Sequence, residues 1–465
     1  MEFLSGVMEK DVKELSELKA ADMAGKVVTV NGAVHTIRDM GNIAFVVIRK
    51  REGLLQCVWE EGKCSRKDNS NNSDHHDFHI GQLKEGAAIE AEGVVEKNEK
   101  APGGIEIRLQ SIYVLSEPAD ALPIPIGKWK MNTTLEANLN FRPISLRNIR
   151  ERAKFKIQEG IVTGFRGFLA DQGFTEIHTP KIGARGAEGG ANIFKLDYFH
   201  RPAVLAQSPQ FYKQMMVGVF DRVFETAPVF RAEKHNTKRH LNEYTSLDFE
   251  MGYIDGFEDV MAMETGMLQH MMKLLREKYA TEIALLDIEL PNVERIPCVK
   301  FTQAKELVSL KYNRPIRNPY DLEPEEEVLI SRYFAEEYGA DFVFVTHYPS
   351  KKRPFYAMDD PADPLFTLSF DCLFRGMEIT TGGQRIHDYH MLRQKMADRS
   401  MIPEGISQAD DALQGLEHYL MAFRYGMPPH GGLGIGLERL TMKLIGEDNI
   451  RETTLFPRDL SRLEP

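Results

Sequence analysis

Residues 223–254 read VFETAPVFRAEKHNTKRHLNEYTSLDFEMGYI, and this stretch decides how the C-terminal two-thirds of the chain are interpreted. Two strand-like runs, 223–230 and 245–253, enclose a polar loop rich in Lys, Arg and His. Apolar runs of this length, separated by a polar connection, are typical of two paired β-strands. Taken alone, the stretch is also compatible with an ordinary charged hairpin. The segments on either side of it therefore carry much of the argument.

Two such segments flank it. Upstream, apolar residues recur at spacings of four, four and three, as on one face of a helix: Ile157, Ile161, Phe165 and Phe168. This helix leads into GFTEIHTPKI (173–182), which predicts a strand ending at Pro180. Downstream, PPHGGLGIGLERLTMKLIG (428–446) predicts a Gly-rich strand that runs into a helix. A lone Gly-rich turn is weak evidence, but the order of the three segments is informative.

The remainder of this region mixes both element types. Further strands are expected at 342–346 and 368–374, and further helices at 258–278 and 408–425. The interleaving lacks regular βαβ spacing. It therefore predicts a mixed, mainly antiparallel sheet flanked by helices, which places the chain in the α+β class.

The N-terminal part is strand-like throughout. Five short strands separated by turn residues are expected at 26–34, 43–49, 54–59, 87–95 and 104–115. This number and spacing indicate a small five-stranded β-barrel of the oligonucleotide-binding (OB-fold) kind. We predict a barrel domain over 1–115, a Pro-containing hinge with a Lys-Trp-Lys cluster over 116–142, and a larger domain over 143–465.

A polar insertion at about residues 60–80 interrupts the barrel. Its centre, SRKDNSNNSDHHD, is too polar to bury an ordered core of its own. Cys64 with His75, His76 and His79 matches no zinc-ligand spacing, so we interpret the insertion as a solvated loop.

Composition excludes several classes of protein. The chain of 465 residues has 58 Lys+Arg against 69 Asp+Glu, a net charge of −11, which argues against a polybasic nucleic-acid binder. No run approaches about 18 uncharged apolar residues, so no membrane-spanning helix is expected. The charged N-terminus lacks the apolar run of a signal peptide. Four cysteines are too few for a disulfide framework, and we expect a cytoplasmic protein.

The three segments resemble motifs 1, 2 and 3 of the class II aminoacyl-tRNA synthetases. With the barrel, residues 24–465 resemble the aspartyl-tRNA synthetases of the archaeal and eukaryotic type. The long matches are AQSPQFYKQ, FRAEKHNTKRHLNE, TTGGQRIH, GLGIGLERL and LFPRDLSRL. The resemblance implies ATP-dependent activation of L-aspartate to aspartyl-adenylate, its transfer to tRNA-Asp, and a homodimer built on motif 1.

Adenylate formation is an attack by a carboxylate on the α-phosphorus of ATP. The nucleophile is already ionised at pH 7, so catalysis needs positioning and charge stabilisation and no general base. By resemblance, Arg231 contacts the α-phosphate and Arg439 spans adenine and γ-phosphate, so these two are the candidate catalytic residues. The implied ATP-binding set is Arg231, Ala232, Glu233, Arg239, His240, Leu241, Glu378, Gly436, Leu437, Glu438 and Arg439.

The same resemblance implies a Mg²⁺ site. Mg²⁺ prefers oxygen ligands and shares them with phosphates. Glu378 matches the metal-binding glutamate of the family, and Thr381 stands where many relatives have Ser while keeping the hydroxyl.

Aspartate and asparagine differ in what their side chains require. A carboxylate needs cations, and Lys213 with Arg385 match the two residues that hold the substrate β-carboxylate in aspartyl enzymes. Asparaginyl relatives lack the lysine. A buried lysine facing an amide is unpaired, which costs roughly 1–3 kcal/mol or more. The implied aspartate-binding set is Glu188, Gln207, Gln210, Lys213, Arg231, Thr381 and Arg385.

The barrel resembles the anticodon-binding domain of the family. Phe45 matches the aromatic residue that stacks on a base, and Arg38 and Gln56 match residues that read the anticodon. His35 stands where relatives that charge only tRNA-Asp commonly carry Trp, and with Pro102 it resembles the relaxed members. We therefore expect a non-discriminating enzyme that also aspartylates tRNA-Asn for a separate amidotransferase; a discriminating enzyme is the alternative.

Three other readings are less favoured. Lys213 argues against an asparaginyl enzyme, and intact Arg231, Glu378 and Arg439 argue against a catalytically dead RNA-binding paralogue. A tRNA-independent amide-forming ligase has no use for an anticodon barrel. The positive charge is expected in one pocket and on the barrel, and the acidic excess elsewhere, for example at 323–327.

Overall fold

The computed structural model describes residues 6–7, 10–67, 76–186, 192–234, 237–401 and 415–464. The chain divides into two compact units, Met1–Glu151 and Arg152–Pro465, each described by itself below. Among the described residues, no helix is both long enough and apolar enough to cross a membrane.

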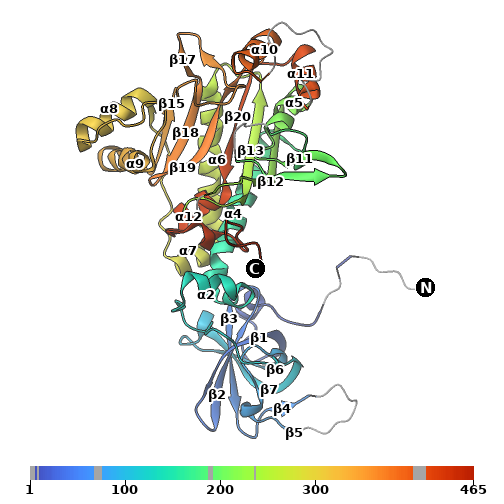
Figure 1. Cartoon of the computed structure of the whole chain (residues 1–465). Helices are drawn as coiled ribbons and strands as arrows, with labels where there is room; N and C mark the ends of the chain where they lie inside the picture. The colour runs from blue at the N-terminus through green and yellow to red at the C-terminus, as the bar shows by residue number, and fades with distance from the viewer. Residues whose placement is uncertain are drawn as a thin grey trace. The chain divides into compact units, whose positions relative to one another are not determined.

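The first unit is a β-barrel. Its five long strands are β1 (Val27–Asp39), β2 (Ile43–Arg49), β3 (Leu54–Glu60), β6 (Ala88–Lys97) and β7 (Ile105–Ser116). They follow the order β3-β2-β1-β6-β7, and a parallel β3–β7 pairing closes the barrel. Alternate residues such as Ala44, Val46 and Ile48 point inward and are fully buried. The expected five-stranded OB-type barrel is confirmed (Figure 1).

The insertion differs from the solvated loop we expected. Ser65–Arg66 (β4) and His76–Asp77 (β5) pair as two short antiparallel strands. Cys64 and Phe78 are buried in the barrel core, and the Trp59 Nε1–H donates to the Phe78 carbonyl oxygen at 2.9 Å. Apolar residues at both ends of the polar run thus anchor it, and the expectation was wrong for these ends. His75 and the rest of 68–75 lie outside the described residues.

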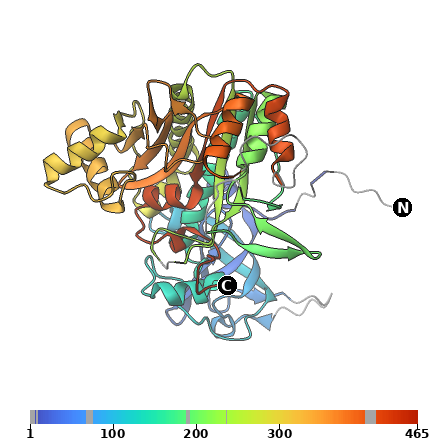
Figure 2. The ribbon, with the colours of Figure 1, turned by 45° about the horizontal axis from the view of Figure 1, so that its top comes forward.

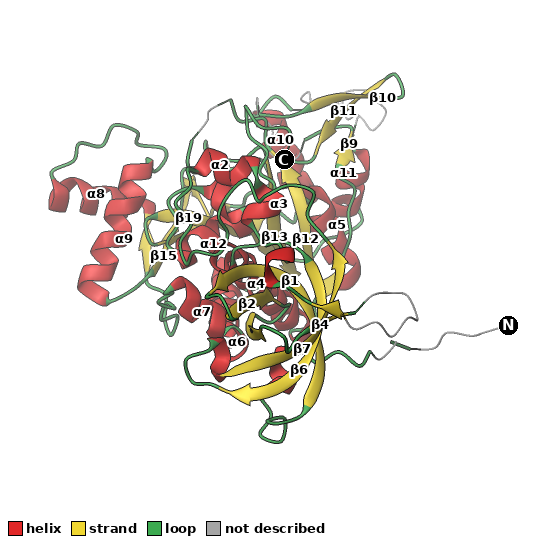
Figure 3. Cartoon of the chain, turned by 90° about the horizontal axis from the view of Figure 1, so that it is seen from below, coloured by secondary structure: helices red, strands yellow, loops and turns green. Residues whose placement is uncertain are grey.

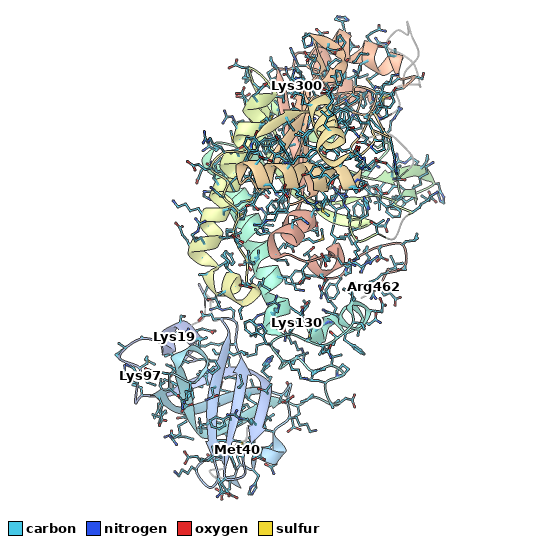
Figure 4. The ribbon with its side chains drawn as sticks, turned by 90° about the vertical axis from the view of Figure 1, so that its left-hand side faces the viewer. Lys19, Met40, Lys97, Lys130, Lys300 and Arg462 are labelled. Atoms are coloured by element: carbon cyan, nitrogen blue, oxygen red, sulfur yellow. The ribbon has the colours of Figure 1, made fainter. Side chains whose placement is uncertain are left out.

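Short elements complete this unit. They are α1 (Leu15–Leu18), the 3₁₀ turns η1 (Ile80–Gln82) and η2 (Pro102–Gly104), α2 (Leu135–Asn140) and α3 (Arg142–Ser145). Figure 4 shows Met40, in the β1–β2 turn, at one end of the barrel and Lys19 and Lys97 toward the other. The segment predicted as a hinge, 116–142, contains α2, whose N-terminus is capped by the Thr134 hydroxyl.

The second unit is built on an eight-stranded sheet. Its strands are β8 (Thr175–Glu176), β12 (Arg222–Phe230), β13 (Glu243–Gly252), β14 (Cys298–Lys300), β15 (Phe342–Thr346), β18 (Ser369–Phe374), β19 (Met377–Arg385) and β20 (His430–Gly436). The order is β14-β15-β18-β19-β20-β13-β12-β8, antiparallel except for the β14–β15 and β12–β8 pairs. The expected mixed, mainly antiparallel sheet is confirmed. The strand expected to end at Pro180 is shorter than predicted, because only Thr175–Glu176 pairs with β12.

Helices surround this sheet. They are α4 (Ile149–Asp171), α5 (Gln210–Phe220), α6 (Phe257–Lys278), α7 (Ala280–Leu286), α8 (Phe301–Tyr312), α9 (Pro324–Tyr338), α10 (Tyr389–Asp398), α11 (Glu417–Arg424) and α12 (Leu437–Ile445). Apolar residues of α4 and α6 pack with those of β13, β19 and β20 in one large core. Figure 2 shows α8 and α9 together beside one edge of the sheet. Of the helix expected at 408–425, the part up to 414 lies outside the described residues.

Minor elements lie around these. A small sheet joins β9 (Ile182–Gly183), β10 (Lys195–Tyr198) and β11 (Arg201–Leu205), and β16 (Asp359–Asp360) pairs with β17 (Asp363–Thr367). A 3₁₀ turn, η4 (Ile450–Thr453), follows α12. Figure 3 shows the β10–β11 hairpin extending away from the main sheet.

Candidate active site

One face of the central sheet is polar because of the alternation along β13. Leu247 and Phe249 are buried in the apolar core, so the residues that alternate with them, Ser246, Asp248 and Glu250, point to the opposite face. Each of these polar residues pairs with a glycine of β20: Ser246 with Gly436, Asp248 with Gly434, and Glu250 with Gly432. Polar side chains therefore stand on β13, and the neighbouring strand leaves space beside them.

Gly432 shows why this strand is Gly-rich. A Cβ atom on Gly432 would lie 2.2 Å from the Glu250 Oε2 atom and 2.2 Å from the Phe249 carbonyl oxygen. Both distances are too short for a contact between a carbon atom and an oxygen atom. The glycine is thus required for Glu250 to lie flat on the sheet, which is a structural role that we did not predict.

A cavity of about 310 Å³ opens above this face. Fourteen of the predicted site residues line it: Gln207, Gln210, Lys213, Arg231, Glu233, Arg239, His240, Leu241, Glu378, Thr381, Arg385, Gly436, Glu438 and Arg439. Ala232 and Leu437 do not line it; Leu437 is buried in the core of the unit. Glu188 lies outside the described residues. The cavity thus brings together positively charged side chains, as expected from the sequence: Lys213, Arg231, Arg239, Arg385 and Arg439.

Lys213 lies at one end of the cavity and is only 2% exposed. Its ammonium group is 2.9 Å from Asp248 Oδ1, 2.8 Å from the Leu433 carbonyl oxygen and 3.4 Å from Glu250 Oε2. Because α5 begins at Gln210, the lysine falls in its first turn and projects to the sheet. This geometry fixes the ammonium on three sides.

Arg385 lies beside Lys213 and is also buried. Its Nε donates to Glu250 Oε1 at 2.9 Å, and Nη2 donates to the Gly432 carbonyl oxygen at 2.8 Å. Burial alone raises the pKa of Glu250, but the Arg385 and Lys213 cations outweigh it and hold that pKa below its usual value. Glu250 is therefore ionised and bridges the two cations.

Several polar atoms at this end lack a hydrogen-bond partner among the described residues. They are Gln207 Oε1, Gln210 Nε2 and Asp248 Oδ2. The Gln207 Nε2–H donates to the Asn192 carbonyl oxygen at 3.1 Å. This hydrogen bond fixes the Gln207 side-chain amide, and its oxygen remains available to accept a hydrogen bond from a ligand. A buried polar group without a partner costs free energy, so such atoms indicate a polar ligand. Two cations and an open acceptor suit an amino acid with an acidic side chain.

Glu378 and Thr381 lie toward the other end of the cavity. The Thr381 hydroxyl donates to Glu378 Oε1 at 3.0 Å, although residues three apart on a regular strand face opposite sides. The pairing of β19 with β18 skips Ile379, and this bulge brings both side chains to the cavity. The Arg439 Nη1–H donates to the Glu378 carbonyl oxygen at 3.1 Å and lies 3.6 Å from its carboxylate.

The charge state of Glu378 follows from its neighbours. Burial alone raises its pKa, but the guanidinium groups of Arg439 and Arg353 hold it below the usual value. Glu378 is thus an ionised carboxylate next to a hydroxyl, the donor set that suits Mg²⁺. No group of three or more His, Cys, Asp or Glu that could hold a metal occurs within the described ranges.

Arginines dominate this end of the cavity. The Arg231 guanidinium lies 5.7 Å from the centre of the Tyr244 ring, and Arg239 and Arg439 stand nearby. Burial and then the Arg439 charge lower the pKa of His240, whose Nδ1 is 2.6 Å from the Thr237 hydroxyl. A neutral imidazole among three guanidinium groups is well suited to an incoming polyanion.

Glu327 corrects one expectation. We expected residues 323–327 to carry acidic excess away from the site, but Glu327 of α9 is buried, pairs with Arg239 and accepts the Glu378 N–H at 3.2 Å. Burial raises its pKa to about 7. The run looks solvent-exposed in sequence because its neighbours are charged, yet one helical face of it packs against the sheet.

The remaining predicted nucleotide residues that line the cavity are held in different ways. The Glu438 carboxylate accepts the Thr245 N–H at 3.1 Å, and burial raises its pKa to about 7. Glu233 Oε2 accepts from Asn192 Nδ2 at 3.2 Å. Leu241 is buried beside the cavity in a small apolar cluster. These groups shape one wall of the cavity.

Arg353, which lines the cavity, and its partner Asp371 were also missed from the sequence. Asp371 of β18 pairs in register with Thr381 and binds the Arg353 guanidinium at 2.7 Å. Burial raises the pKa of Asp371 to about 6. The alternation of Ser369, Asp371 and Leu373 on a buried strand was the available signal, since a carboxylate there requires a partner. Arg353 lies in a loop and had no such pattern.

The predicted anticodon residues lie in the barrel unit. Arg38 and Phe45 pair across β1 and β2, with the guanidinium 4.7 Å from the ring centre. The Gln56 Nε2–H donates at 2.8 Å to Glu106 Oε2, a residue that the sequence did not reveal. His35 is buried, and the β1–β2 register skips it, so it is the extra residue of a bulge.

Known proteins resemble both units. Residues 134–460 match the family of class II tRNA synthetases described as D, K and N, and residues 28–115 match the OB-fold nucleic acid binding domain. The aspartate–tRNA(Asp/Asn) ligase of Deinococcus radiodurans is 46% identical over 447 residues, 95% of this chain and 96% of that protein. The aspartate–tRNA(Asp) ligase of Pyrococcus horikoshii is 40% identical, covering 96% and 97%. The asparaginyl-tRNA synthetase of P. horikoshii, solved with asparaginyl-adenylate, has a TM-score of 0.85 at 30% identity, covering 98% of this chain and 100% of that one.

Proposed function

The chain belongs to the class II tRNA synthetases of the D, K and N group, and on this premise we propose that it is an aspartate–tRNA ligase that charges both tRNA-Asp and tRNA-Asn. We infer aspartate as the amino acid from one observation: two buried cations, Lys213 and Arg385, lie at one end of the cavity. The other end of the same cavity is lined by arginines. The fold alone does not decide it, because an asparaginyl enzyme shares the fold.

The first step joins aspartate to AMP. The substrate α-carboxylate attacks the α-phosphorus of ATP, the bond to the leaving pyrophosphate breaks, and aspartyl-adenylate forms. Arg231 and Arg439 stabilise the charge that develops on the phosphates, and Arg239 with His240 holds the outer phosphates. The side-chain carboxylate rests on Lys213 and Arg385, and the Gln207 amide oxygen accepts from the α-ammonium group. In the second step a hydroxyl of the terminal ribose of the tRNA attacks the aspartyl carbonyl carbon, the bond to the phosphate breaks, and the aspartyl group is transferred to the 3′ end of the tRNA as AMP leaves.

Mg²⁺ fits the site together with ATP. Glu378 and Thr381 supply a carboxylate and a hydroxyl oxygen, and ATP phosphates complete such a ligand set. The ion supplies charge neutralisation for the triphosphate when it is bound. The chain's own arginines orient the α-phosphate toward the amino acid.

The use of tRNA-Asn is supported by the barrel. The relative from D. radiodurans is named for both tRNAs, and that from P. horikoshii for tRNA-Asp alone. By the resemblance, His35 stands where enzymes that charge only tRNA-Asp commonly carry Trp, and we infer that the smaller ring removes an element that rejects the wrong third anticodon base. The product Asp-tRNA-Asn then serves a separate amidotransferase. A homodimer formed through motif 1 and a cytoplasmic location complete the proposal.

Charging of purified transcripts tests tRNA use. We expect aspartate to be attached to tRNA-Asn at a rate similar to tRNA-Asp, and His35→Trp to depress tRNA-Asn charging about tenfold more than tRNA-Asp charging. Thermal melting of the variant controls for damage, because His35 is buried. A wild-type rate on tRNA-Asn about 10³-fold below that on tRNA-Asp contradicts the relaxed specificity and leaves the discriminating enzyme.

A further inference from the structure

Three buried side chains form a row of hydrogen bonds behind the amino-acid end of the cavity. The Tyr419 hydroxyl of α11 donates to Gln214 Oε1 of α5 at 3.0 Å, and Gln214 Nε2 lies 3.0 Å from Nε2 of His430, the first residue of β20. The His430 Nδ1 atom is 2.9 Å from the Pro428 carbonyl oxygen. All three side chains are at most 2% exposed, and none of them lines the cavity. We call Tyr419, Gln214 and His430 the relay.

The direction of every bond in the relay is determined. A carbonyl oxygen only accepts, so His430 Nδ1 carries the hydrogen and donates to Pro428. The other ring nitrogen then accepts from the Gln214 amide N–H, and the amide oxygen accepts from Tyr419. Burial lowers the pKa of His430 to about 4, so the ring is neutral at pH 7. A fully satisfied buried network of this kind fixes the groups that it joins.

The relay joins the elements that carry the two substrate-side cations. Gln214 follows Lys213 directly in α5, and His430 pairs in register with Arg385 across β20 and β19. Two and three residues along β20, the carbonyl oxygens of Gly432 and Leu433 accept from Arg385 and Lys213. Figure 1 shows α5 and α11 side by side near β20, as their packing requires. The relay thus ties α5, which carries Lys213, to the strand that pairs with Arg385.

We propose that Gln214 and His430 are positioning residues that hold Lys213 and Arg385 at the spacing which accepts a β-carboxylate and rejects an amide. This inference rests on the proposed function, since it concerns the amino acid that the enzyme activates. A neutral ring is part of the arrangement. The charged or titratable groups facing His430 are Glu250 on β13, Arg385 at the end of β19 and His387 just beyond it, and Tyr419 of α11 lies one hydrogen bond further away, behind Gln214. An imidazolium there would compete with both cations for Glu250.

Two near-isosteric variants separate positioning from mere packing. His430→Gln places an amide oxygen where Nε2 stood and keeps an acceptor for Gln214, whereas His430→Asn keeps the donor to Pro428 and loses that acceptor. Both variants remove the ring.

The assay is pyrophosphate exchange with the concentrations of aspartate, asparagine and ATP varied in turn. His430→Asn should raise the KM for aspartate and lower the aspartate-to-asparagine preference, each about tenfold, without changing the KM for ATP. His430→Gln should remain close to wild type.

Further variants keep the test decisive. Gln214→Leu should change the KM for aspartate and the amino-acid preference as much as His430→Asn does. The double variant should show no larger change than either single variant, because both substitutions break the same hydrogen bond between Gln214 and His430. Leu392→Val, in α10 and in the same apolar core as Tyr419, is the packing control and should leave the amino-acid preference unchanged. If His430→Asn does not fold, Tyr419→Phe replaces it in the test: it removes a single hydrogen bond, and the same changes in the KM for aspartate and in the amino-acid preference are expected.

Equal effects of His430→Asn and His430→Gln, or a parallel rise in the KM for ATP, overturn the inference. Wild-type enzyme that activates asparagine instead contradicts the proposed function itself.

Discussion

Replacing Lys213 with methionine is expected to lower kcat/KM for aspartate activation about 10³-fold, mainly through the KM for aspartate. The substitution keeps the volume but leaves Asp248 and Glu250 buried beside a single remaining cation, Arg385. It also removes one of the two positive charges that, in the proposed function, balance the incoming β-carboxylate. Pyrophosphate exchange with varied aspartate measures the effect, and the KM for ATP should change little.

Lys305→Met is the matched control. Lys305 is likewise a buried lysine paired with a carboxylate, at 2.5 Å from Glu326 Oε2, but it does not line the cavity. We expect this control to lower the melting temperature and to leave the KM for aspartate unchanged. Similar kinetic losses in the two variants would show that Lys213 acts through stability alone.

Replacing Arg439 with alanine is expected to lower kcat for adenylate formation about 10²- to 10³-fold. Arg439 binds the Glu378 carbonyl oxygen and lies beside its carboxylate. The proposed function places the charge that develops as pyrophosphate leaves at this end of the cavity. Because this interaction strengthens in the transition state, kcat should fall much more than the affinity for aspartate. Single-turnover formation of the adenylate measures the step.

Arg108→Ala is the control for Arg439. Arg108 of β7, in the barrel unit, forms an ion pair with Glu96 at 2.7 Å and does not line the cavity. It should behave as wild type in both kinetic parameters. An Arg439→Ala enzyme with unchanged kcat contradicts the assignment of this arginine to the reacting phosphates.

The sequence allowed the architecture to be predicted because the strands and helices carry strong periodic patterns. Ile157, Ile161 and Phe165 recur at helical spacing and are fully buried, and the barrel strands alternate as expected. The cavity brought together most of the residues chosen by resemblance. Functional roles for those residues remain predictions that the variants above test.

What the sequence did not reveal depends on contacts between distant segments. Glu327 looked like part of an exposed acidic run, and only its packing against Arg239 and the Glu378 amide shows otherwise. Asp371 and Arg353 meet across a strand and a loop. The bulge at Ile379 likewise has no local signature, although it decides that Glu378 and Thr381 face the same side.

Amino-acid-dependent pyrophosphate exchange by the wild-type enzyme tests the central claim most directly. With ATP saturating, we expect aspartate to support exchange and asparagine to support it at least about 10³-fold less efficiently. The reason is that Lys213 and Arg385 form a buried pair of cations that an amide cannot satisfy. Exchange supported by asparagine, with aspartate inactive or much weaker, would contradict the account.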